Sequence, residues 1–255
     1  LRGRTHESGS FWTWRDLMYR AAGRLTPDSY REFATAVFSE MVLAGWTTVG
    51  EFHYVHHQSD GTPYSDHGME LALADAAEAA GIRLVLLDTC YLAGGFDQPL
   101  SPEQVRFGDT SGEEWLTRWH SLREALSGRA LVTLGAALHS VRAVPRAELG
   151  TVARGLAADV PLHIHLSEQP AENAACLAAH GLTPTELLDA EGVLSPRLSA
   201  VHATHLSAND IALLAKAHVT AVFCPTTEAD LGDGIGPARE LADAGVSLGW
   251  SHRAR

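Results

Sequence analysis

The sequence predicts an α/β fold in which one parallel sheet curls into a (β/α)8 barrel, and three observations support this. Short apolar runs alternate with longer segments of helical period along the 255 residues. Polar residues that include histidine follow several of these runs, and barrel active sites are built at the carboxyl ends of the strands. No glycine-rich phosphate loop follows the first run, which argues against a doubly wound dinucleotide-binding sheet.

The expected strands are the apolar runs at 47–54, 83–90, 131–139, 161–166, 199–204, 219–224 and 246–249. The first helix is marked by Thr26-Pro27-Asp28, a capping residue followed by proline, and it ends at Gly45. Further helices are expected over 69–80, 113–126, 146–157, 172–179, 208–217 and 237–244. These strands are one short of closure. We therefore expect a single, partial barrel domain over residues 1–255, with the first strand lying before Leu1 and the C-terminal part missing.

Composition excludes several classes of function. The formal net charge of −12 argues against a nucleic-acid partner, because phosphate binding needs a basic face. No apolar run approaches the roughly 20 residues that span a bilayer, so we expect no membrane association, and no signal-peptide pattern is present. Cys90, Cys176 and Cys224 are odd in number and far apart, which argues against disulfides and fits the cytoplasm.

The strongest motif runs from His163 through His165 to Glu168. Alternate residues of a strand share a face, so the two histidines point the same way, and the glutamate follows just past the strand end. A histidine ligand beside a carboxylate suits a metal-activated water and its proton shuttle. The same pattern is also typical of two hydrogen-bonded histidines in a barrel lumen, and the motif alone leaves both interpretations open.

Two neighbouring strand ends strengthen the first interpretation. His202 and His205 end the next strand, and one of them is expected to face the lumen beside His165. His139 and Arg142 end the preceding strand, where an arginine can hold a carboxylate in a bidentate pair or form a salt bridge to a loop acid.

Two further segments are more ambiguous. We interpret His56 and His57 as a solvated loop that follows the Glu-Phe-His-Tyr strand at 51–54. Segment 224–234 is rich in hydroxyls, acids and glycines, which predicts either a loop over the substrate or an ordinary solvated connection. Cys224 has no evident base beside it, so we interpret its thiol as structural.

Taken together, six segments resemble the formimidoylglutamate deiminases, a family of the amidohydrolase superfamily that acts in histidine degradation. They are Phe-Trp-Thr-Trp-Arg at 11–15, Glu-Phe-His-Tyr at 51–54, and segments 139–144, 163–169, 202–205 and 224–234. The resemblance extends from Leu1 to about Gly249. The first two segments distinguish this family from guanine deaminases and triazine hydrolases, which share the barrel.

The resemblance implies one zinc ion, or a similar divalent metal, and hydrolysis of the formimino C=N bond of N-formimidoyl-L-glutamate. The products would be N-formyl-L-glutamate and ammonia. Carried over by position, His165 would be a zinc ligand, Glu168 the general acid/base, and His202 would polarise the attacked group. Zinc lowers the pKa of its water toward ~7, and the glutamate would carry the proton to the departing nitrogen.

The resemblance also implies the partner. Tyr54, His139 and Arg142 would bind the substrate, with the arginine suited to a glutamate carboxylate. The expected partner is therefore a small formimino-amino acid, and a homodimer remains an open expectation.

The sequence departs from the family at the metal ligands. The family's His-x-His pair would precede Leu1, and its aspartate at the last strand is replaced by Gly249-Trp250-Ser251-His252. Of four expected ligands only His165 remains, and Trp250 places an apolar ring where the acid should project. The departures imply that residues 1–255 alone neither hold zinc tightly nor catalyse.

Two other functions remain open. The first is another amidohydrolase deaminase, acting on an amidine, a guanidino compound or a purine. The second is a non-catalytic remnant that binds acidic amino-acid derivatives without turning them over.

Overall fold

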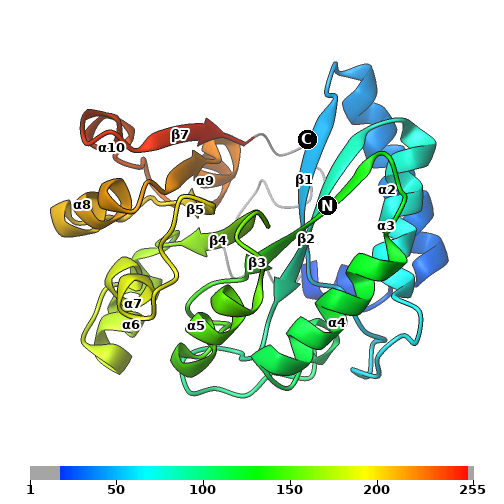
Figure 1. Ribbon diagram of the computed structural model, residues 1–255, viewed down its shortest axis with the longest axis horizontal. Helices are drawn as coiled ribbons and strands as arrows, with labels where there is room; N and C mark the ends of the chain where they lie inside the picture. Colours follow the sequence, from blue (N-terminus) through cyan, green and yellow to red (C-terminus); the bar gives the residue numbers. More distant parts are fainter. Residues whose placement is uncertain (1–17, 252–255) are drawn as a thin grey trace.

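The computed structural model describes residues 18–251, and its strands form one parallel sheet in the order β1 to β7 (Figure 1). The strands are β1 (Thr48–His53), β2 (Arg83–Cys90), β3 (Val132–Leu138), β4 (Leu162–Leu166), β5 (Leu198–His202), β6 (Thr220–Phe223) and β7 (Ser247–Trp250). Each lies within two residues of a predicted strand. In the described part of the chain, β1 and β7 each pair with a single neighbour. The predicted partial barrel is confirmed.

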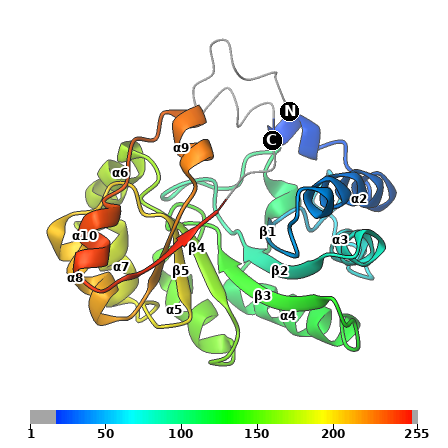
Figure 2. The same ribbon diagram turned by 90° about the horizontal axis from the view of Figure 1, so that it is seen from above.

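The helices lie outside the curled sheet, as Figure 2 shows from above. They are α2 (Pro27–Leu43), α3 (Gly68–Ala80), α4 (Gly112–Ala125), α5 (Arg146–Gly155), α6 (Pro170–His180), α7 (Pro184–Ala190), α8 (Ala208–Lys216), α9 (Pro225–Leu231) and α10 (Ala238–Asp243), with a 3-10 turn at Val105–Phe107. The successive strands and their crossover helices leave the carboxyl ends of all the strands at one rim.

Local capping explains where several helices begin. Thr26 starts α2 through a capping box with Ser29, as its position before Pro27 predicts. Helix α7 is not expected from apolar spacing, although Thr183 and Glu186 form the same capping box around Pro184. That Thr-Pro-x-Glu pattern is the signal that could have predicted it.

The main core lies between the outer face of the sheet and the helices. Trp115 and Trp119 of α4 are fully buried there, and the Trp119 indole donates a hydrogen bond of 3.0 Å to the carbonyl of Gly135 in β3. This contact fixes α4 against the middle of the sheet. No helix within residues 18–251 has the length and apolarity to cross a membrane. The predicted features at 1–3, 11–15 and His252 lie outside the described residues.

Candidate active site

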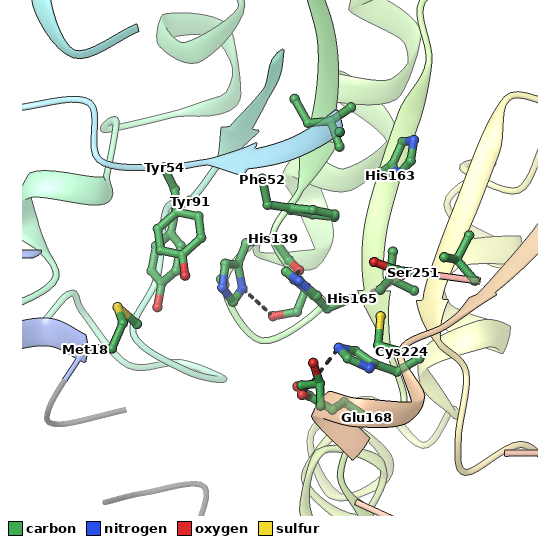
Figure 3. Close-up of a pocket in the computed structure, with 18 of the residues that line it drawn as sticks. Met18, Phe52, Tyr54, Tyr91, His139, His163, His165, Glu168, Cys224 and Ser251 are labelled. Carbon is green, nitrogen blue, oxygen red and sulfur yellow. Dashed lines mark hydrogen bonds and ion pairs between the residues drawn. The ribbon is translucent and has the colours of Figure 1, made fainter. Parts of the chain in front are cut away.

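A cavity of about 480 Å³ lies at the strand carboxyl ends, and all six residues proposed from the sequence line it. These are Tyr54, His139, Arg142, His165, Glu168 and His202. They come from the ends of β1, β3, β4 and β5, so four separate strands converge on one space (Figure 3).

His165 is held as a neutral ring with a free lone pair. Its Nδ1 lies 2.8 Å from the carbonyl oxygen of His139, and since a carbonyl only accepts, Nδ1 carries the proton and donates. Burial, followed by the charge of His202, lowers the pKa of His165 to about 3. Its Nε2 is therefore unprotonated, which is the state that binds a metal ion.

His163 lies on the same side of β4, two residues nearer its start, and also lines the cavity. Burial lowers its pKa to about 4. The ring of Phe52 contacts both histidines, with centroids 4.2 Å from His165 and 5.9 Å from His163. The lumen below His165 is therefore apolar enough to keep His163 neutral.

His202 sits between two carboxylates. Its Nε2 is 3.4 Å from Oε1 of Glu168, and its Nδ1 is 3.3 Å from Oε1 of Glu228. Burial alone would lower its pKa, but hydrogen bonds to Cys224 and Glu228 and the charge of Glu168 raise it to about 10. His202 is therefore an imidazolium, and its φ of 70° shows a backbone held in the left-handed region at the end of β5.

The segment after β6 differs from its interpretation as an open loop. Pro225–Leu231 forms helix α9, which brings Glu228 back so that its Oε1 accepts a 2.7 Å hydrogen bond from the backbone N–H of Cys224. Cys224 also contacts His202, so the interpretation of its thiol as remote from any base is wrong. The reason is the helical turn, which folds this segment onto the end of β5.

Asp233 follows α9 in the chain and is buried, and one of its carboxylate oxygens lies within 4.8 Å of ligand atoms of Glu168 and His202. Its Oδ1 accepts a hydrogen bond from the Gln169 amide, and its carbonyl accepts one of 2.8 Å from His205 Nε2. His205 is thus engaged by this segment, and His202 is the histidine of the pair that lines the cavity. Burial and the nearby charge of Glu168 raise the pKa of Asp233 to about 7.

The other side of the cavity is aromatic and cationic. Figure 3 shows Tyr54, Tyr91 and His139 facing the same space as His165. The Tyr91 ring lies 4.6 Å from His139, and its hydroxyl accepts a 2.7 Å hydrogen bond from Gln104. Sequence reasoning missed Tyr91 because it follows a strand whose end carries no histidine.

Arg142 reaches the cavity from the segment after β3. Its Nε lies 3.9 Å from Oε2 of Glu172, a buried acid of α6 and not of a loop. Burial raises the pKa of Glu172, while burial and the nearby positive charge of Arg142 hold the pKa of His139 well below its ordinary value. The Arg142 guanidinium thus stands near a neutral imidazole, and its buried Nε has no hydrogen-bond partner among the described residues.

His56 and His57 are not solvated, so that interpretation is wrong. They are 2% and 3% exposed. His56 Nδ1 lies 2.9 Å from Oε1 of Glu70, and His57 Nε2 lies 3.5 Å from Oδ1 of Asp109. The carboxylates that pair with these two histidines belong to later segments of the chain and lie outside the lumen.

His165 fits one position of a metal site, but its neighbours do not complete the set. Within residues 18–251, three groups of histidine, cysteine, aspartate and glutamate are close enough to share an ion, and none includes His165. Trp250, at the end of β7, lines the cavity and remains 67% exposed. Two of the three groups lie at the cavity, Glu168 with His202 and Asp233, and His202 with Cys224 and Glu228, so His165 stands apart from the donor atoms that are close enough to share an ion.

The sequence profile of the amidohydrolase family matches residues 1–252. The chain belongs to this family. It is 42% identical over 242 residues to the formimidoylglutamate deiminase of Pseudomonas aeruginosa, a match that covers 94% of this chain and 53% of that protein. The chain thus spans about half the length of this relative.

Solved structures show the same fold. An amidohydrolase from Brucella melitensis superposes with a TM-score of 0.90 at 39% identity, covering 98% of this chain and 56% of the other. A zinc-bound adenosine deaminase from Xanthomonas campestris superposes with a TM-score of 0.77 at 24% identity, covering 96% and 51%. At 24% identity, the superposition on the adenosine deaminase shows a shared fold and nothing more.

Proposed function

We propose that the protein hydrolyses the C=N bond of N-formimidoyl-L-glutamate in the cytoplasm, as a step of histidine degradation. The products are N-formyl-L-glutamate and ammonia. The observation that carries the proposal is that one cavity holds Arg142 together with Glu168 and His202. The 42% identity to a formimidoylglutamate deiminase supports it.

Substrate binding follows from the charges at the cavity. Arg142 takes a carboxylate of the glutamate, because its guanidinium offers a planar pair of N–H donors. Tyr54 and His139 flank the chain of the substrate. The formimino group then reaches Glu168 and His202 at the other side of the cavity.

Proton transfer is assigned to Glu168. Its carboxylate carries both protons of the attacking water to the departing nitrogen, the first as the C–O bond forms and the second, from the resulting hydroxyl, as the C–N bond breaks and ammonia leaves. Both N–H groups of the His202 imidazolium face carboxylates, so His202 holds Glu168 in place through the 3.4 Å ion pair and polarises the reacting group through its positive charge. We propose that a divalent ion, with zinc as the first candidate, takes His165 as one ligand and supplies Lewis acidity.

The test is a chimera in which this chain replaces the matching half of the P. aeruginosa deiminase, with the unmodified relative as positive control. Ammonia release is measured from N-formimidoyl-L-glutamate, guanine and adenosine after loading with zinc. We expect the formimino compound to be hydrolysed far faster than either purine. Equal or faster turnover of a purine, or a folded, zinc-loaded chimera without turnover, would contradict the proposal.

A further inference from the structure

A second group of buried polar side chains lies outside the cavity, between the sheet and helices α3 and α4. His53 ends β1, His56 follows it, Glu70 is in the first turn of α3, and Asp88 is in β2. All four are at most 2% exposed. Donor atoms of His53, His56 and Glu70 lie within 4.8 Å of one another, and Oδ1 of Asp88 lies 3.3 Å from His56 Nδ1.

Three atoms of this group have no hydrogen-bond partner. They are Nε2 of His53, Oε2 of Glu70 and Oδ2 of Asp88, and each is buried. A buried polar atom without a partner costs about 1–3 kcal/mol, and more when it is charged. Among the described residues fifteen buried side-chain atoms lack a partner, and three of them gather in this one cluster, where a bound water or an ion would pair with them.

The outer contacts of the two histidines turn one nitrogen of each ring toward the cluster. His56 Nε2 donates a 2.9 Å hydrogen bond to the carbonyl oxygen of Thr89, so Nδ1 is the nitrogen turned toward the cluster; it lies 2.9 Å from Oε1 of Glu70, and a bound ion would take the place of the proton between them. His53 Nδ1 lies 3.4 Å from the hydroxyl of Tyr30, which can accept its proton and leave Nε2 free. Histidines that bind metals are held in this way by acceptors on the far nitrogen.

The carboxylates are also held from outside. Arg118 NH1 donates hydrogen bonds to Oε1 of Glu70 at 3.2 Å and to Oδ1 of Asp88 at 3.1 Å. The second oxygen of each carboxylate is the one without a partner. Arg118 therefore orients both acids and does not occupy the free oxygens.

Charge balance points to a divalent ion. Glu70 is buried against three basic side chains: its Oε1 lies 3.2 Å from Arg118 NH1, 2.9 Å from His56 Nδ1 and 3.7 Å from His53 Nε2. Glu70, Asp88 and Asp109 all pair with Arg118, and three carboxylates less one guanidinium leave two negative charges. Either two protons on the histidines or one divalent cation would balance them, and the cation also fills the three open positions.

We propose that His53 Nε2, His56 Nδ1, Glu70 and Asp88 form a structural site for a divalent cation. Two imidazole nitrogens and two carboxylates suit tetrahedral zinc. The ion would tie the end of β1, where Tyr54 enters the cavity, to β2 and α3. This proposal departs from the expectation that residues 1–255 hold no zinc tightly, which considered only the lumen.

The experiment uses residues 1–255 refolded from denaturant with zinc, with magnesium, or with a chelator, because buried ligands are accessible only during folding. Desalted protein is analysed for metal content and thermal unfolding, and zinc uptake is followed by calorimetry in two buffers. We expect one zinc per chain, a higher unfolding temperature with zinc than with magnesium, and proton release on binding. No retained zinc, or no difference between zinc and chelator, would overturn the proposal.

Matched variants place the ion. Glu70→Gln and His53→Asn should each abolish the bound zinc, whereas His165→Asn, in the lumen, should keep it. Loss of zinc in His165→Asn with retention in Glu70→Gln would overturn the site. If the cluster variants do not fold, cobalt replaces zinc in the parent chain and in His165→Asn. Identical visible spectra of a four-coordinate ion support the site, and a spectrum lost in His165→Asn refutes it.

Discussion

His163 offers a test of whether the lower lumen is dry in solution. Burial is the cause that lowers its pKa to about 4 in the folded chain, against ~6.5 for an unfolded histidine. Because the pKa of His163 is lower in the folded chain than in the unfolded chain, its titration does not change the free energy of unfolding above about pH 6.5. As the pH falls from about 6.5 toward the pKa of the folded chain, the unfolded chain binds a proton that the folded chain does not, and the free energy of unfolding decreases.

The magnitude follows from that shift. Between about pH 7.5 and 5.5 the unfolded ring gains most of a proton and the folded ring stays neutral, which sets a limit of about 1.4 kcal/mol. The side chain is only half-buried, so water that reaches it reduces the expected effect to about 1 kcal/mol. Replacing His163 with leucine should remove this pH-dependent cost.

Urea unfolding followed by circular dichroism at both pH values measures the effect. The free energy of unfolding of His163→Leu, relative to the parent chain, should rise by about 1 kcal/mol on acidification. His120→Gln, which changes an exposed histidine of α4, is the matched control and should leave the difference unchanged. Parallel pH profiles for the parent and His163→Leu would show that the lumen is wet and would refute the reasoning.

Three further predictions concern the site and one cap. In the chimera, Glu168→Gln should keep its metal content but lower kcat by about 10²–10⁴-fold, and normal turnover would remove the proton-transfer role. Arg142→Met should mainly raise KM for N-formimidoyl-L-glutamate, and an unchanged KM would mean that the arginine serves only Glu172. Thr183→Ala in residues 1–255 should lower the free energy of unfolding by about 1 kcal/mol. The Thr183 hydroxyl accepts a hydrogen bond from the backbone N–H of Glu186 at the start of α7 and donates one of 2.5 Å to Asp210. An unchanged urea midpoint would contradict this prediction.

Much of the fold was accessible from local patterns. Strand alternation placed His163 and His165 on one face, and their common exposure to the cavity follows from the pleat. The positions of His139 and His202 at strand ends brought them to the same rim, because parallel strands in a barrel end together. These inferences need only the period of the chain and the rule of the fold.

The remainder depended on contacts between distant segments. The burial of His56 could not be predicted, since its partners Glu70 and Asp88 come from α3 and β2. The imidazolium state of His202 depends on Glu228, which reaches it only because α9 folds back. No spacing within either segment encodes these contacts.

The most direct test of the proposed function is the identity of the products. The zinc-loaded chimera is incubated with N-formimidoyl-L-glutamate, and the formimino proton is followed by NMR while ammonia is assayed in parallel. Hydrolysis of the C=N bond predicts the appearance of N-formyl-L-glutamate with one equivalent of ammonia. Release of glutamate and formamide would show that the other C–N bond is cleaved and would contradict the proposed function.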